Sequence, residues 1–176
     1  MYYHRYYPYP PDHHDRYVYS TYGYHPWMDR PAYTPGYWKE YIHLKDYGNE
    51  PFVVNIHHAA LQNDNFRLAL WTGKYLQLTL MKINPGEDIG LEMHPDVDQF
   101  IRIEQGHGLV LMGDDKDNLN YRRRVWDDYV VFIPAGKWHN LINTGHIPIK
   151  LYSIYAPPEH PHGTVHKTKE DAQHHE

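Results

Sequence analysis

Short apolar runs separated by turn residues fill the chain between about residues 75 and 155. Apolar and polar positions alternate along these runs with the period of two that a half-buried strand requires. Strands are therefore expected over residues 75–83, 90–94, 99–104, 108–112, 129–133, 140–143 and 149–155. Turn-forming residues separate them, as in Asn84-Pro85-Gly86 and Pro134-Ala135-Gly136. The pattern predicts an all-β domain in which two antiparallel sheets close on one apolar core.

Two further segments have other patterns. Residues 55–70 favour a short helix, because Ile56, Ala59, Ala60 and Leu61 fall on one side of it. Residues 114–128 are polar and predict a loop or hairpin between the two halves of the barrel, with the basic run 122–124 on a solvated face.

The two ends of the chain differ in composition from the middle. Residues 1–40 hold eleven of the 18 tyrosines and six of the 14 prolines and show no helix or strand period. Such a segment is a biased arm rather than a second domain, either flexible or binding another surface. We therefore divide the chain into an arm at 1–40, a barrel at 41–156 and a polar C-terminal tail at 157–176.

Charge and residue content exclude several classes of function. The formal charge is −5 and the basic residues are scattered apart from the run 122–124, so a nucleic-acid partner is not expected. No segment approaches the ~20 apolar residues of a membrane helix, so we expect a soluble protein of the cytoplasm. The chain has no cysteine, so any metal must lie on imidazole and oxygen ligands.

Side-chain parity brings four chelating groups toward one face. Glu92 and His94 lie two residues apart in an expected strand and share a face. In the next strand, the apolar positions 101 and 103 mark the inward face, which includes Gln99 and excludes Asp98. His139 follows the turn 134–136 at the start of another strand, where its imidazole can enter the same barrel mouth.

Two imidazoles, one carboxylate and one amide oxygen suit a divalent metal ion and leave coordination positions for water or substrate. Burying Glu92 without a cation would cost several kcal/mol or force its protonation. The sequence therefore predicts one metal site made of Glu92, His94, Gln99 and His139.

These residues resemble the two motifs of the cupin superfamily. The residues that fit are Gly86, His94 and Gly106 in the first motif, and Pro134, Gly136, His139 and Asn143 in the second. Three positions depart from the usual pattern: Glu92 replaces a His, Gln99 replaces a Glu and Asp128 replaces a Gly. The resemblance implies a double-stranded β-helix, or jelly-roll, barrel that binds Zn, Mn or Fe and pairs as a homodimer.

A narrower resemblance extends over most of the chain after residue 50. The segments LWTGKYLQLTLM, GLEMHPDVDQF and FIPAGKWHNLINTG look like small bacterial cupins described as similar to mannose-6-phosphate isomerase. This resemblance implies isomerase-type chemistry on a small sugar, polyol or sugar phosphate, with the metal as Lewis acid. The candidate proton-transfer groups are Glu92, Tyr75, Tyr152 and Lys137. The candidate phosphate contacts are Arg67, Lys74 and Lys137.

Two alternatives remain open. Two histidines and a carboxylate also suit oxygen activation on Fe(II), as in a dioxygenase. The Tyr-rich arm resembles proteins of bacterial spore coats in composition, so a non-catalytic assembly role and a spore-coat location form the other alternative.

Overall fold

The computed structural model describes residues 41–173. The Tyr/Pro-rich arm expected at 1–40 lies outside the described residues, as do residues 174–176. Within residues 41–173 strands predominate over helices, which confirms the all-β class. No helix in this range is long and apolar enough to cross a bilayer.

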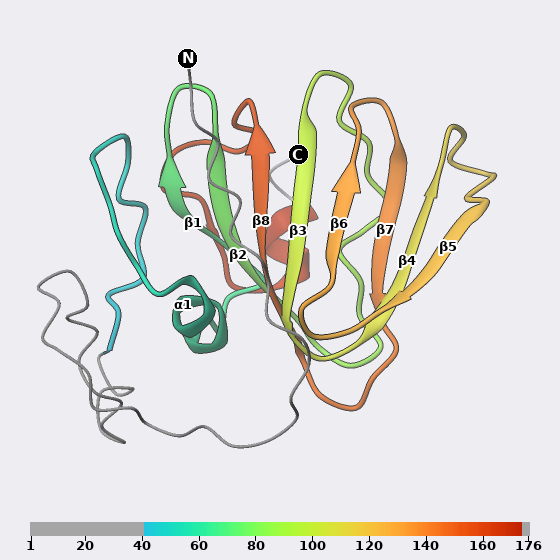
Figure 1. The fold of residues 1–176 in the computed structure, drawn as a ribbon, viewed down its shortest axis with the longest axis horizontal. Helices are drawn as coiled ribbons and strands as arrows, with labels where there is room; N and C mark the ends of the chain where they lie inside the picture. The colour runs from blue at the N-terminus through green and yellow to red at the C-terminus, as the bar shows by residue number, and fades with distance from the viewer. Residues whose placement is uncertain (1–40, 174–176) are drawn as a thin grey trace, which may run out of the picture. The chain divides into compact units, whose positions relative to one another are not determined.

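Two antiparallel sheets form the folded unit (Figure 1). The larger sheet has the order β6-β3-β8-β2-β1-β9, with the bounds Val130–Ile133, Asp98–Gln105, Ile149–Ala156, Gln77–Ile83, Arg67–Thr72 and Val165–His166. The smaller has the order β5-β4-β7, with the bounds Tyr121–Val125, Gly108–Gly113 and Trp138–Asn143. Ile101 and Leu151 of the larger sheet and Val110 and Leu141 of the smaller one share a single buried cluster. The two sheets therefore pack face to face as the expected jelly roll.

The inner face of the larger sheet changes from polar to apolar along its strands. Cross-strand register places the inward residues in successive rows: Gln77, Tyr155 and Gln99; then Thr79, Ser153 and Ile101; then Met81, Leu151 and Ile103. All of these side chains are buried. One end of the interior is therefore lined by groups that need hydrogen-bond partners, and the other end is the apolar core.

Helix α1 (Ile56–Gln62) covers the outer face of the larger sheet (Figure 1). Asn55 begins the helix, since its side-chain oxygen accepts a hydrogen bond from the His58 N–H at 3.0 Å. Ala59 and Ala60 are fully buried in a second cluster with leucines of β1 and β2. The helix expected within 55–70 is confirmed, but residues 67–70 belong to β1. That strand was missed because its residues 67–70 are all buried and do not alternate.

The second cupin-like motif is held by hydrogen bonds to its neighbours. The buried Asn143 amide donates to the carbonyls of Ile83 and Ile147, both at 2.9 Å, and its oxygen accepts from the Gly145 N–H at 2.8 Å. Asp128, at the usual glycine position, has the positive φ of 70° that glycine adopts most readily. The backbone of the motif is thus retained although one residue departs from it.

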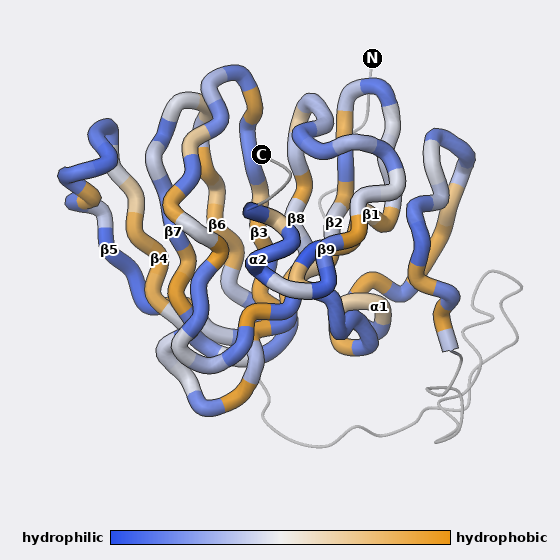
Figure 2. Tube along the Cα trace, turned by 180° about the vertical axis from the view of Figure 1, so that it is seen from behind, coloured by the Kyte–Doolittle hydropathy of each residue, from blue (hydrophilic) through white to orange (hydrophobic). Residues whose placement is uncertain are grey.

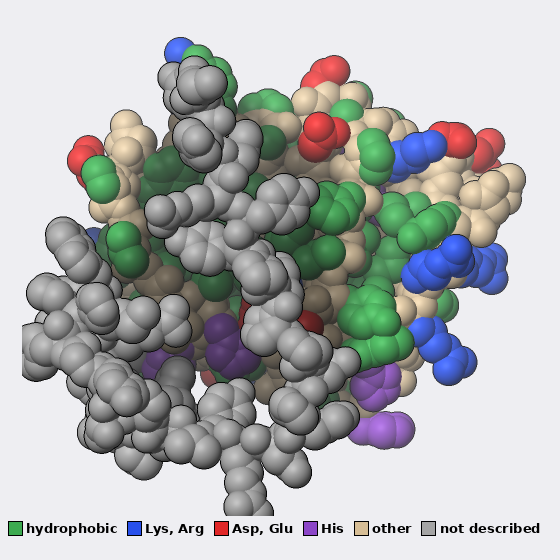
Figure 3. Space-filling model, viewed as in Figure 1, with side chains coloured by type: hydrophobic (Ala, Val, Ile, Leu, Met, Phe, Trp, Pro, Cys, Tyr) green, Lys and Arg blue, Asp and Glu red, His purple; other side chains and the backbone are tan. Residues whose placement is uncertain are grey.

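Two expected elements differ from the structure. The strand expected at 90–94 is replaced by an irregular segment that bridges β7 at Asp88 and at Glu92, because Gly90 has a φ of 97° that interrupts extended backbone. The polar segment 114–128 contains β5, so the hairpin alternative holds. Figure 2 shows β5 as largely hydrophilic, and Figure 3 shows basic side chains gathered at its edge of the sheet.

The segment after Ala156 is more than a polar tail. β9 pairs with β1, and Ala172 of helix α2 (Lys169–Gln173) joins the main buried cluster. The Asp171 carboxylate accepts the N–H groups of Lys167 and Thr168, both at 3.0 Å, and so caps the N-terminus of α2. The folded unit therefore continues to residue 173, which composition alone did not reveal because most of these side chains are polar.

Candidate metal centre

The backbone joins the two motif segments at the residues expected to bind metal. Glu92 and His139 exchange both backbone hydrogen bonds, with N–O distances of 3.1 and 2.9 Å. The N–H of Gly136, in the turn before β7, donates to the carbonyl of His94 at 2.7 Å. Residues that are more than forty positions apart in the chain are thus held in one register.

Three side chains meet at this point. The Oε1 atom of Glu92 lies 3.3 Å from Nε2 of His139 and 3.6 Å from Nε2 of His94. One ligand atom from each residue lies within 4.8 Å of the others, and both imidazoles are buried. One carboxylate oxygen and two imidazole nitrogens at this spacing form a donor set for a divalent ion.

The outward nitrogens of the two imidazoles have partners of their own. Nδ1 of His139 lies 2.8 Å from the Lys137 carbonyl oxygen, which only accepts, so this nitrogen carries the proton. Nδ1 of His94 lies 3.0 Å from Oε1 of Glu159, and the same assignment follows. Both Nε2 atoms are then lone-pair acceptors, and both are buried without a hydrogen-bond partner. Unsatisfied acceptors that face one carboxylate fit a cation between them.

The charges in the group are set by their neighbours. Burial alone would raise the pKa of Glu92, but the contacts with His139, His94 and Arg67 outweigh it and hold the pKa well below its usual range. Burial lowers the pKa of His94, whereas Glu92 and Glu159 raise it, and the net direction is upward. Without an ion, the contacts with Glu92 and Glu159 thus favour the protonated form of His94.

Gln99 and Asp98 occupy opposite faces of β3. Gln99 is 3% exposed and donates from Nε2 to the Ser153 hydroxyl at 3.0 Å, while its Oε1 is buried without a partner. Asp98 is exposed, and its Oδ1 accepts the N–H of Ala135 at 2.9 Å. The regular pleat therefore turns the amide inward and uses the aspartate to hold the turn at 134–137.

Comparison with known proteins decides the family. The profile of the cupin domain family matches residues 79–155, the stretch that contains both motif segments. The chain belongs to the cupin superfamily. It is 67% identical over 129 residues to the uncharacterized protein YrkC of Bacillus subtilis, covering 73% of this chain and 69% of that one. It is 41% identical over 118 residues to the uncharacterized protein L612 of Acanthamoeba polyphaga mimivirus, covering 66% and 72%.

A solved structure supports the same assignment. The crystal structure of BH2720 from Bacillus halodurans is similar to this cupin with a TM-score of 0.74 and 60% sequence identity, covering 74% of this chain and 99% of that one. This similarity supports the fold and the family. The mannose-6-phosphate isomerase-like subtype is not decided by these relatives.

Two of the expected proton-transfer residues lie elsewhere in this cupin. Tyr75 is 71% exposed, with the Lys74 ammonium 4.9 Å from its ring centre. The Lys137 ammonium forms an ion pair with Asp114, and only its backbone carbonyl reaches the site, at His139. Both residues lie in turns, where strand parity does not apply, and their role in proton transfer stays a prediction. Glu92 is the member of that group that the structure places with the imidazoles.

Several residues around the centre were not assigned to it from the sequence. Arg67 was considered only as a phosphate contact, yet its Nη2 lies 3.7 Å from Oε2 of Glu92. Tyr155 contacts His94 edge to face at 5.7 Å between ring centres and contacts His160 at 5.1 Å. Burial, reinforced by Arg67, lowers the pKa of His160 to about 3, so its imidazole is neutral. In the sequence, the one sign that Arg67 is buried was its place as a single arginine within the apolar run 66–70.

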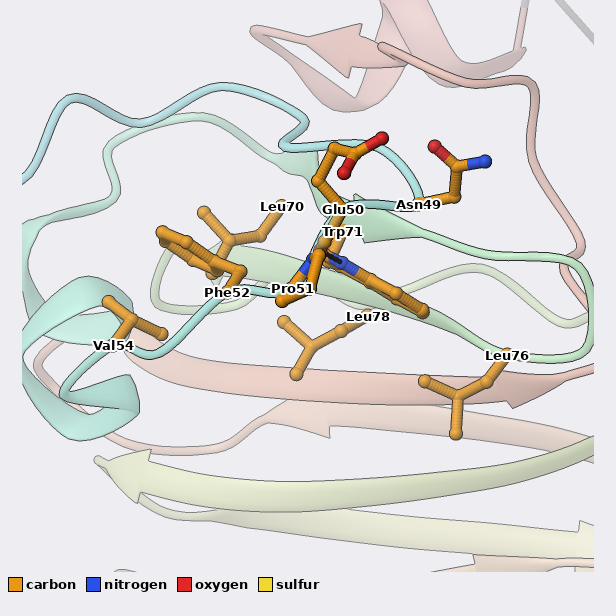
Figure 4. Close-up of a pocket in the computed structure, with 9 residues that line it drawn as sticks. All are labelled: Asn49, Glu50, Pro51, Phe52, Val54, Leu70, Trp71, Leu76 and Leu78. Atoms are coloured by element: carbon orange, nitrogen blue, oxygen red, sulfur yellow. Dashed lines mark hydrogen bonds between the residues drawn. The ribbon is translucent and has the colours of Figure 1, made fainter.

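A separate groove of about 470 Å³ lies on the outer side of β1 and β2 (Figure 4). Its lining is largely apolar and includes Phe52, Leu70, Trp71 and Leu78. The Trp71 indole N–H donates to the Glu50 carbonyl at 2.8 Å, which fixes the segment at 50–54 over the strand. Glu92, His94 and His139 do not line this groove.

Proposed function

We propose that this cupin binds a divalent metal ion on Glu92, His94 and His139, with Gln99 as a fourth oxygen ligand. The ion would act on a small sugar, polyol or sugar phosphate by isomerase-type chemistry. The observation that carries the proposal is the pair of buried imidazole Nε2 atoms that lack partners and face one ionised carboxylate.

The residues around the centre support a role in binding oxygen ligands. An ion held by three or four protein groups keeps open positions, and it would polarise a coordinated carbonyl or hydroxyl. The Lys137 carbonyl and the Glu159 carboxylate orient the two imidazoles. The Tyr155 hydroxyl is buried without a partner and burial raises its pKa to about 12, so it stays a neutral donor.

A second candidate is oxygen activation on Fe(II). The donor set of two histidines and one carboxylate is the set that non-haem Fe(II) oxygenases use. In addition, the pKa values of Glu92 and His160 are both displaced below their usual ranges, which weakens each as a base at neutral pH. An isomerase needs such a base, whereas oxygen activation does not.

Metal analysis followed by two assays tests these functions. The full chain is purified without a metal-affinity column, its metal is identified by elemental analysis, and His139→Ala serves as the metal-deficient control. Isomerase-type chemistry predicts solvent deuterium incorporation next to the carbonyl of hexose or pentose phosphates, detected by NMR. The second candidate predicts oxygen uptake that requires Fe(II). A wild-type protein with no bound metal at all would contradict both.

We also propose a homodimer formed through the outer face of β3 and β6. Phe132 is 70% exposed on β6, the terminal strand of the larger sheet. Its ring lies 5.3 Å from that of Phe100, which is 6.1 Å from that of Tyr152. Among residues 41–173, β6 pairs on one side only, and an aromatic row beside such a sheet edge favours self-association.

A further inference from the structure

We propose that Arg67 and the bound metal ion together form a binding site for a carboxylate that is adjacent to a chelating oxygen. The ligand class is then a 2-hydroxy or 2-oxo carboxylate, including sugar acids. This inference rests on the proposed metal site, and among the sugar derivatives considered above it favours a sugar acid over a sugar phosphate.

Arg67 is buried in the interior with its charge incompletely matched. It is 1% exposed, and its Nε atom is buried without a hydrogen-bond partner. Among residues 41–173 its one ion pair is with Glu92, at 3.7 Å, which is too long for a hydrogen bond. Buried arginines are normally held by close, bidentate partners, so this guanidinium has donors left for a ligand.

The backbone of Arg67 is fixed, so its position is a property of the fold. It lies in β1 between Met81 of β2 and His166 of β9, paired with both. From that row the long side chain extends toward the polar end of the interior, where Glu92 lies. The sheet therefore holds the guanidinium beside the metal ligands without help from a loop.

Charge in the interior requires an anion once the ion is bound. In the metal-free protein Glu92 and Arg67 cancel each other. A divalent ion adds two positive charges, and the carboxylate of Glu159 at His94 removes one of them. One positive charge then remains in a buried site, where an unbalanced charge is costly. A monocarboxylate neutralises it, while a phosphate dianion would leave a negative excess.

Neutral polar groups without partners lie on the inner face of the same sheet and beside it. The Tyr155 hydroxyl and the Thr79 hydroxyl are fully buried and have no partner. Nε2 of His160 is likewise buried without a partner, beside the ring of Tyr155. Unsatisfied groups of this kind are rare in an interior, and together they can bind the oxygens of a hydroxylated ligand.

The place of Arg67 favours a carboxylate over a distant phosphate. Glu92 contacts both imidazoles through one oxygen and faces Arg67 through the other. The guanidinium is therefore separated from the imidazoles by a single carboxyl group. A ligand oxygen on the metal and an acid on the neighbouring carbon fit this spacing, whereas the phosphate of a sugar phosphate lies several carbons from the carbonyl.

Calorimetric titration of the metal-loaded full chain tests the inference. The probes are glycolate, its neutral isostere glycolamide, and glycerol 3-phosphate. The variant is Arg67→Met, which keeps much of the side-chain length but removes the charge and the guanidinium donors. The matched control is Arg102→Met, an arginine of β3 that pairs with Glu104 and Asp128. We expect Arg67→Met to weaken glycolate about 30-fold or more, since a charge-paired contact is lost. Glycolamide binding should change less than about 3-fold, and the control should match wild type.

The outcomes separate this inference from the proposed metal site. Metal content and melting temperature are measured first, and Arg67→Lys, which keeps the charge, is titrated whether or not Arg67→Met folds. We expect Arg67→Lys to retain metal. Its preference for glycolate over glycolamide should fall about 10-fold, because the ammonium lacks the planar, two-pronged donor geometry of the guanidinium. A loaded Arg67→Met or Arg67→Lys that binds glycolate like wild type overturns the inference alone. Tighter binding of glycerol 3-phosphate than of glycolate also overturns it. A wild type without metal contradicts both proposals.

Discussion

Replacing Gln99 with Glu tests the electrostatics of the centre more sharply than removing a ligand. The amide is 3% exposed, donates to Ser153 at 3.0 Å and leaves its Oε1 without a partner. A carboxylate of the same shape cannot donate to Ser153, whose hydroxyl already lies 3.2 Å from the Phe100 carbonyl as a donor. The variant therefore loses one hydrogen bond and adds a second buried negative charge to the interior that holds Glu92.

The substitution should destabilise the metal-free protein but strengthen its binding of metal. In the metal-free protein the lost hydrogen bond costs about 1 kcal/mol, and the buried charge, or its protonation, adds roughly 2 kcal/mol or more. At roughly 3–5 °C per kcal/mol for a domain of this size, the metal-free melting temperature should fall by about 10 °C. A full charge beside a divalent ion outweighs an amide dipole, so the Kd for metal should fall about 10- to 100-fold.

Asp98→Asn is the matched control because it removes a charge from the neighbouring residue. Asparagine keeps an Oδ1 that can accept the Ala135 N–H, so its stability should remain within about 0.5 kcal/mol of wild type. Thermal unfolding of chelator-treated and reloaded protein, with metal Kd from chelator competition, measures both effects. Our reasoning on the face of β3 is refuted if Asp98→Asn empties the site and Gln99→Glu changes neither quantity.

Three further predictions concern the site and the assembly. His94→Ala and His139→Ala should each lower metal affinity by orders of magnitude while His58→Ala, on α1, retains wild-type metal content; equal metal in all three by elemental analysis would place the ion elsewhere. The gain in melting temperature on metal loading should widen between about pH 6 and 8. The pKa of His94 is raised in the metal-free fold, so the stability that its protonation adds to that fold is complete below ~6.5 and is lost as pH rises. Metal binding, in contrast, needs the neutral ring and strengthens over the same range. A constant gain over this range, read by calorimetry, would contradict it. Phe132→Glu should convert the proposed dimer to a monomer in light scattering, and a wild-type monomer at micromolar concentration would rule the dimer out.

The sequence predicted those features that depend on spacing and parity. Glu92 and His94 are two residues apart, and His139 follows a Pro-x-Gly turn at a fixed offset, so their convergence could be inferred without coordinates. The alternation at positions 101 and 103 likewise placed Gln99 on the inner face, where the structure has it. For Gln99 this holds because β3 is a regular strand that fixes the side-chain direction. Glu92 and His94 lie instead in the irregular segment, which backbone hydrogen bonds to His139 and Gly136 hold in place.

The sequence could not predict features that depend on which strands become neighbours. Arg67 reaches Glu92 only because β1 pairs with β2, and that strand was hidden in an unalternating run. Glu159 and His160 approach the centre because the chain after Ala156 folds back, although their polar surroundings look like a tail. The side chains of Tyr75 and Lys137 could not be placed from the sequence either, because turn geometry rather than strand parity directs them.

The departures of this chain from the usual cupin motif form one coupled change. The usual arrangement has a histidine at position 92 and a glutamate at position 99, and here the acid and the uncharged ligand have exchanged places. With the acid at 92, the carboxylate lies 3.7 Å from Arg67 and balances that buried cation when no metal is present. With the amide at 99, the Ser153 hydroxyl receives a donor instead of facing a second acceptor.

Restoring the usual residues one at a time would therefore leave a charge without a partner. A histidine at 92 would remove the counter-charge of Arg67, and a glutamate at 99 alone would add an anion beside Glu92. The total charge of the ligand set is the same in both arrangements, and its position differs. The acid at position 92 gives the buried guanidinium a counter-charge beside the proposed metal site. It thus connects the altered motif to the class of ligand that we propose.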